Sequence, residues 1–185
     1  MVAGKRVPGP RRMLPALLVA VLTHAPGASA DQVTQAMTVK AAITPGCWFG
    51  SSQSPVTSLG VIDFGTVYRL DKSVKTKSTV SAGSIVMRCT PGTTFRVDIN
   101  EGSNATRSSF AYSGRQLKSA AGKVLKYELY QDSGYLKRWG QNNDGVLLTA
   151  TSSAIDLTVY AELRSTQAMP EPGLYTDDLI VTVYY

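Results

Sequence analysis

The sequence predicts an all-β protein of the sandwich or barrel class. Apolar and polar residues alternate with period two over many short segments, and turn-forming residues separate these segments about every 8–12 residues. No stretch keeps the helical period of about 3.6 residues over three turns. The C-terminal segment is a strongly alternating strand that no further segment follows.

The N-terminal residues 1–30 are predicted to be a signal peptide. Basic residues precede an apolar run over residues 13–22, and an Ala-Ser-Ala cleavage site follows at residues 28–30. The basic residues are Lys5, Arg6, Arg11 and Arg12. The apolar run is shorter than the roughly 20 residues that cross a bilayer. We therefore expect an exported protein whose mature chain begins near Asp31.

Removal of this peptide changes the charge balance. The full chain carries 19 Lys and Arg against 13 Asp and Glu, a net charge of +6, and cleavage lowers the basic count to 15. The mature net charge is then only +2, which argues against a nucleic-acid partner. The only histidine, His24, leaves with the peptide.

Residues 35–43 alternate and predict a strand that precedes the domain proper. One face carries Met37, Val39, Ala41 and Ile43, and the other carries Thr38, Lys40, Ala42 and Thr44. The turn-forming sequence at residues 44–46 ends the segment. We therefore expect an N-terminal strand within residues 31–44 and a β-domain over residues 45–185.

The domain itself contains several further strand candidates. They span residues 59–64, 84–89, 94–100, 124–130, 135–139, 146–149 and 154–163. Residues 69–81 are polar and lysine-rich, which is typical of a loop or a guarded edge strand. Residues 101–114 are rich in Gly, Asn and Ser and predict a long loop.

The last strand candidate begins at Leu179. Its core face would carry Leu179, Val181, Val183 and Tyr185. Because nothing follows it, we expect an unpaired strand edge whose backbone donors and acceptors need a partner.

Two cysteines, Cys47 and Cys89, remain in the mature chain. An even number of cysteines in an exported protein favours a disulfide, and two unpaired buried thiols are the alternative. Closing a loop of this length would stabilise the fold by on the order of 4 kcal/mol.

The mature chain carries no recognised catalytic, metal or cofactor motif. Without histidine, Ser-His-Asp and Cys-His sites are excluded, and two cysteines alone cannot form a structural zinc site. No Ser-x-x-Lys motif and no glycine-rich phosphate loop occurs. We therefore expect no enzyme and no cofactor; a glycosidase that uses two carboxylates across a cleft is the remaining enzymatic alternative.

Several segments together resemble the spore coat protein U domain family, which includes the shaft subunits of archaic chaperone–usher pili. They are the strand that ends in Thr44-Pro45-Gly46-Cys47, Ile62-Asp63-Phe64-Gly65, Ile85-Val86-Met87-Arg88-Cys89, Lys126-Tyr127-Glu128-Leu129-Tyr130-Gln131-Asp132 and the closing strand to Tyr185. The resemblance implies an incomplete immunoglobulin-like sandwich that lacks its last strand. A periplasmic chaperone, and then the N-terminal strand of the next subunit at an outer-membrane usher, would complete it.

The resemblance also implies roles for particular residues. Met37, Val39, Ala41 and Ile43 would be the donor side chains, and Leu179, Val181, Val183 and Tyr185 would line the acceptor groove. The implied function is a fimbrial subunit that polymerises on the cell surface in adhesion and biofilm formation. The alternative is a self-complete secreted binding module in which residues 35–43 pair within their own domain.

Overall fold

The computed structural model describes residues 33–50, 56–105, 107–108, 111–112 and 114–185. The chain divides into two units, residues 1–41 and 42–185. In the first unit, the described residues 33–41 form no helix or strand, and their side chains are exposed. The predicted signal peptide lies outside the described residues.

The second unit consists of short β-strands, which confirms the predicted all-β class. They are β1 (Cys47–Phe49), β2 (Val74–Lys77), β3 (Ile85–Cys89), β4 (Thr94–Ile99), β5 (Arg107–Ser108), β6 (Ala111–Tyr112), β7 (Arg115–Ser119), β8 (Val124–Tyr130), β9 (Val146–Thr149), β10 (Ile155–Leu157), β11 (Tyr160–Leu163), β12 (Tyr175–Thr176) and β13 (Val181–Tyr184). A single 3-10 turn, η1 (Asn142–Asp144), is the only helical element in the described part of the chain. No helix there is long and apolar enough to span a bilayer.

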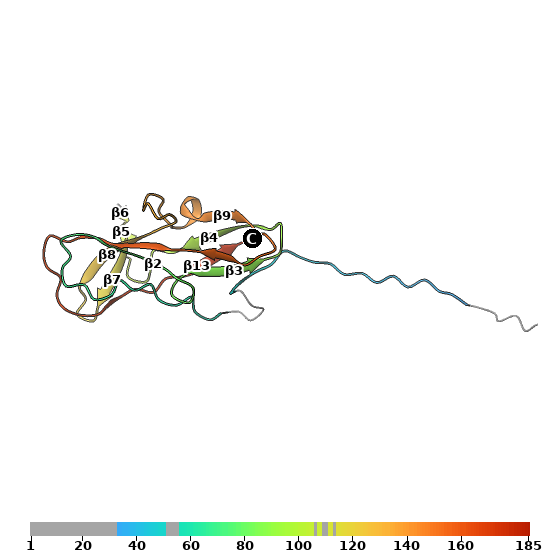
Figure 1. The fold of residues 1–185 in the computed structure, drawn as a ribbon, viewed down its shortest axis with the longest axis horizontal. Helices are drawn as coiled ribbons and strands as arrows, with labels where there is room; N and C mark the ends of the chain where they lie inside the picture. Colours follow the sequence, from blue (N-terminus) through green and yellow to red (C-terminus); the bar gives the residue numbers. More distant parts are fainter. Residues whose placement is uncertain (1–32, 51–55, 106, 109–110, 113) are drawn as a thin grey trace, which may run out of the picture. The chain divides into compact units, whose positions relative to one another are not determined.

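The strands form antiparallel sheets that pack as a sandwich around one core. Their orders are β1-β3-β10, β13-β4-β9 and β12-β7-β8-β11-β2, and β5 and β6 form a separate hairpin. Figure 1 shows β7 and β8 at one end of this unit and β3, β4, β9 and β13 at the other. The lysine-bearing β2 lies at a sheet edge, as its composition predicts.

The core is built from the inward faces of the central strands. Phe95, Val97 and Ile99 of β4 are each at most 2% exposed, in agreement with the alternation of this segment. Trp139 is 1% exposed, and its indole Nε1–H donates to the Val97 carbonyl at 3.0 Å. The sandwich therefore buries its large aromatic side chains with their polar atoms paired.

The predicted strand at residues 154–163 is split between two sheets. β10 pairs with β3, whereas β11 pairs with β8 and β2. The change occurs at Val159, whose N–H donates to the Ser78 hydroxyl at 2.8 Å and whose C=O accepts from the Ser78 N–H at 2.8 Å. Ser78 thus satisfies the backbone where the chain passes from one sheet to the other.

Within the domain, three predictions of local structure differ from the structure. Residues 59–64 alternate in burial but have no strand ladder; the Leu59 carbonyl accepts from the Gly83 N–H at 2.9 Å. Residues 135–139 form no named strand: Arg138 makes only an isolated antiparallel bridge with Tyr130, and the Asp132 carboxylate accepts the Leu136 and Lys137 N–H groups beside the turn. Hydrogen bonds from backbone N–H groups lower the pKa of Asp132, and the bond from Lys137 has the largest effect. The predicted loop over residues 101–114 contains the β5–β6 hairpin.

The predicted disulfide between Cys47 and Cys89 is confirmed. The two residues lie opposite each other in the β1–β3 ladder, with their Cα atoms 4.1 Å apart. This separation is well inside the limit of about 7 Å for a bonded pair. The bond fixes β1, and with it the start of the domain, to the buried strand β3.

We expect the double substitution Cys47→Ala with Cys89→Ala to lower the free energy of unfolding by about 2–4 kcal/mol. The bond closes a loop of 42 residues, so its removal restores conformational freedom to the unfolded chain. Urea unfolding of the oxidised wild type and of the double variant measures the difference, and the yield of exported protein should fall with it. Equal unfolding midpoints would contradict this account.

Candidate functional site

The C-terminal strand β13 lies at an open edge. β4 pairs with it on one side, with Val181 opposite Ile99 and Tyr184 opposite Arg96. Within the residues that the structure describes, no strand pairs with its other side. The same holds for β1, which pairs with β3 alone among the described strands.

An apolar cavity of about 500 Å³ lies beside these two edges. We call it the groove. One wall includes Leu179 and Val181, and another includes Leu59, Ile62 and Phe64 from the segment that precedes β2. Phe49 of β1 and the core residues Ile85, Ile99, Leu117, Leu129, Val159 and Ala161 also contribute to the lining. The groove therefore reaches down to the hydrophobic core, whose lining residues Ile85, Ile99 and Ala161 are at most 2% exposed.

The backbone of β13 presents hydrogen-bonding groups to the open side. Successive residues of an antiparallel strand direct their N–H and C=O groups to opposite sides. The Asn100 N–H donates to the Ile180 carbonyl at 3.0 Å, so Ile180 and, by alternation, Thr182 face β4. The N–H and C=O groups of Val181 and Val183 consequently point away from β4.

The groove has a polar end where the C-terminal strand begins. The Tyr127 hydroxyl donates to Asp177 Oδ2 at 2.7 Å, and both residues belong to the lining. The pKa of Tyr127 is raised far above its usual range. Burial is the larger cause, and the hydrogen bond to the Asp177 carboxylate is the second. Asp177 Oδ1 also accepts from the Asn104 N–H and from Asn104 Nδ2, each at 3.0 Å.

Gly102 is required at this polar end. Its φ of +87° is a left-handed conformation that side chains disfavour, and a Cβ there would lie 1.9 Å from Asp177 Oδ2. The Asn100 side-chain oxygen accepts from the Gly102 N–H at 3.2 Å and from the Ile180 N–H at 2.9 Å. These contacts fix the position of the residues that lead into β13.

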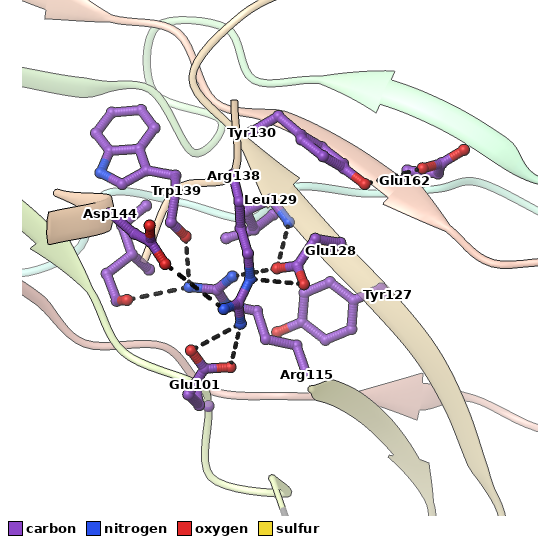
Figure 2. A network of polar contacts seen from close by, with 12 residues as sticks. Glu101, Arg115, Tyr127, Glu128, Leu129, Tyr130, Arg138, Trp139, Asp144 and Glu162 are labelled. Atoms are coloured by element: carbon purple, nitrogen blue, oxygen red, sulfur yellow. Dashed lines mark hydrogen bonds and ion pairs between the residues drawn. The ribbon is translucent and has the colours of Figure 1, made fainter. Parts of the chain in front are cut away.

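A charge network lies next to Tyr127, which with Asp177 forms the polar anchor of the groove (Figure 2). Arg115 is 0% exposed, and its Nη1 donates to Glu128 Oε1 at 2.5 Å. Arg138 Nε lies 2.8 Å from Glu128 Oε2, and Arg138 Nη2 donates to both oxygens of Glu101 at 2.7 and 2.8 Å. Burial alone would lower the pKa of Arg138, but the Glu128 and Glu101 carboxylates raise it overall.

The network also holds the end of β4. Arg115 Nη2 donates to the carbonyls of Ile99 and Trp139 at 3.0 and 2.8 Å, and its Nε donates to the carbonyl of Asn100 at 3.0 Å. Asn100 in turn receives the Ile180 N–H. Arg115 therefore supports, through Asn100, the residues that lead into the open edge of β13.

The sequence matches the family described as Spore Coat Protein U domain over residues 33–182. The chain belongs to this family.

Twelve chains of solved structures match this Spore Coat Protein U domain protein. One is in a structure described as the CsuC–CsuE chaperone–tip adhesion subunit pre-assembly complex from the archaic chaperone–usher Csu pili of Acinetobacter baumannii. It is 22% identical, with a TM-score of 0.44, and the match covers 77% of this chain. The chain spans 40% of the length of that structure's chain. No curated protein matches.

Only two of the four predicted acceptor residues of this Spore Coat Protein U domain line the groove. Leu179 and Val181 line the groove, and Val183 is half-buried against the core. Tyr185 is 64% exposed and lies outside the lining.

The predicted donor residues lie in a segment without secondary structure. Residues 33–46 form no strand, so the strand predicted over residues 35–43 is absent from the single chain. Met37, Val39 and Ile43 are 84–88% exposed, and Ala41 is exposed as well. The segment thus carries a row of apolar side chains that the chain itself does not bury.

Sequence reasoning missed the wall at residues 59–64 and the polar anchor of Tyr127 and Asp177. The alternation of Leu59, Ile62 and Phe64 was a usable signal, but it predicts a strand and not a groove wall. No local pattern relates Tyr127 to Asp177, because the fold brings them together across 50 positions of sequence.

Proposed function

We propose that this protein is a pilus subunit that is exported to the periplasm and polymerised by donor-strand exchange into a surface fibre for adhesion and biofilm formation. A periplasmic chaperone, an outer-membrane usher and neighbouring copies of the subunit are the proposed partners. The observation that carries the proposal is the apolar groove beside the open edge of β13. Membership of the Spore Coat Protein U domain family supports it.

The proposed occupant of the groove is the N-terminal segment of a second copy. This segment carries apolar side chains at alternate positions from Met37 to Ile43, all of them exposed in the single chain. Burying each large one would contribute roughly 1.5–3 kcal/mol. The same segment would extend the sheet by forming a backbone ladder with β13.

The backbone pattern of β13 favours one class of register. In an antiparallel pair, a donor residue opposite Val181 or Val183 exchanges both hydrogen bonds with it and faces the same side. Placing Val39 or Ala41 at these positions directs all the apolar donor residues into the groove. Lys40 then lies on the outer face beside residues such as Thr182, and a slip by one residue would bring Lys40 inward.

The test is a chain that lacks residues 31–43 and retains the signal peptide. Expressed with its chaperone, it should be exported and bind a synthetic peptide of residues 33–44, because its own groove is intact. It should form no fibres, because it has no donor segment. Electron microscopy and gel mobility without boiling measure assembly.

Fibres from the truncated chain equal to those of the full chain would refute donation by this segment. If instead the truncated chain is unfolded even with its chaperone, the segment belongs to its own domain. That result would support the self-complete secreted binding module.

A further inference from the structure

A second, polar recess lies on the five-stranded sheet, and Tyr127 belongs to its lining and to that of the groove. Its volume is about 350 Å³, and its lining includes Arg115, Lys126, Tyr127, Glu128, Arg138 and Arg164. This volume is at the lower end of small-molecule sites, which measure about 300–1,000 Å³. The basic side chains of its lining outnumber the single carboxylate.

The charges in the deeper part of the recess compensate one another. Glu128 Oε1 accepts from Arg115 Nη1 at 2.5 Å and from the Leu129 N–H at 3.1 Å. Glu128 Oε2 lies 2.8 Å from Arg138 Nε, and the Glu101 carboxylate forms an ion pair with Arg138 Nη2 at 2.7 Å. Arg138 Nη1 is only loosely paired, 3.7 Å from Asp144, and the Arg138 side chain is 35% exposed.

Lys126 and Arg164 are not compensated in this way. They are neighbours across the β8–β11 ladder, where the Arg164 N–H donates to the Lys126 carbonyl at 2.9 Å. Both are exposed, and neither forms an ion pair within the described part of the chain. Two like charges directly opposite each other on a sheet destabilise it. A bound anion would remove that repulsion.

We propose that this recess binds the carboxylate or sulfate group of an acidic saccharide. Lys126 and Arg164 contact the oxyanion, and the loosely paired Nη1 of Arg138 is a third donor. A guanidinium presents two parallel N–H donors that match a carboxylate or sulfate. The recess has more volume than the charged group needs, which leaves room for a sugar ring. This binding function is separate from polymerisation and does not depend on it.

The experiment measures binding to the full exported chain by titration calorimetry at constant ionic strength. The probes are D-glucuronate, inorganic sulfate and, as the uncharged comparison, D-glucose. We expect glucuronate to bind and glucose not to bind. We expect Lys126→Gln with Arg164→Gln to weaken glucuronate binding at least tenfold.

The matched control is Lys72→Gln with Lys118→Gln. It removes the same charge from two exposed lysines that do not line the recess, and its affinity should equal that of the wild type. The thermal midpoint of the Lys126/Arg164 variant should not fall, because the substitution removes a repulsion. Equal glucuronate affinity in both variants, or no binding to the wild type, would overturn the proposal. Binding of sulfate without glucuronate would overturn the saccharide assignment and indicate a site for free inorganic anions.

Discussion

Val39→Asp is expected to abolish fibre assembly and to leave the fold of the domain unchanged. Val39 is 84% exposed in the single chain, so the substitution removes no contact from the domain core. In the proposed assembly the same side chain enters the apolar groove of a neighbour. Among the described residues of the lining there is no cationic side chain, so the buried charge would be unpaired at a cost of several kcal/mol.

Lys40→Asp is the matched control. It introduces an aspartate one residue away, on the face that we expect to point outward from the groove. Fibre yield by electron microscopy should fall sharply for Val39→Asp and remain close to the wild type for Lys40→Asp, with both chains recovered in complex with the chaperone. Equal loss in both variants would mean that the segment does not bind in the proposed orientation.

Some strands were predictable from the sequence with their exact bounds. Residues 124–130 and 146–149 form β8 and β9 as predicted, because strand-forming residues fill each segment and turn residues bound it. The C-terminal strand was also predictable, although β13 begins at Val181 and not at Leu179. The residues just before it bond to groups far away in the sequence: the Asn100 side chain accepts the Ile180 N–H, and the Ser103 N–H donates to the Asp178 carbonyl.

The disulfide could be predicted from the cysteine count, and the groove could be predicted only in part. An alternating final strand indicates an edge, and the resemblance to a family indicates what an edge of this kind binds. The second wall was missed because residues 59–64 have the pattern of a strand but lack a partner for a ladder. The alternation of apolar and polar residues indicates which face of a segment is buried. Strand pairing depends on which segments the fold brings together.

The charge network was not predictable because its members are far apart in sequence and have ordinary local patterns. Arg115 begins a strand after a polar segment, and Glu128 alternates with apolar neighbours as an exposed residue would. Yet Arg115 is 0% and Glu128 is 6% exposed. Their burial results from the contact of the paired strands β7 and β8 with the end of β4, which only the three-dimensional structure reveals.

Arg115→Met should lower the free energy of unfolding by about 3–5 kcal/mol, because it leaves Glu128 buried with part of its charge unpaired. It also removes the donors to the carbonyls of Ile99, Asn100 and Trp139. Methionine keeps an unbranched side chain, so the loss reports mainly on the polar contacts. Urea unfolding of the single chain measures it. Arg69→Met is the control, since its pair with Asp71 at 2.9 Å is exposed and is worth at most about 1 kcal/mol.

The same variant tests whether the network supports the acceptor edge. Arg115 holds the Asn100 carbonyl, and the Asn100 side chain accepts the Ile180 N–H next to β13. We therefore expect Arg115→Met to weaken binding of the peptide of residues 33–44 to the groove, under conditions in which the variant is still folded. Arg69→Met should leave peptide affinity unchanged. Full peptide affinity in a folded Arg115→Met chain would restrict the network to stability and would remove its role in positioning the edge.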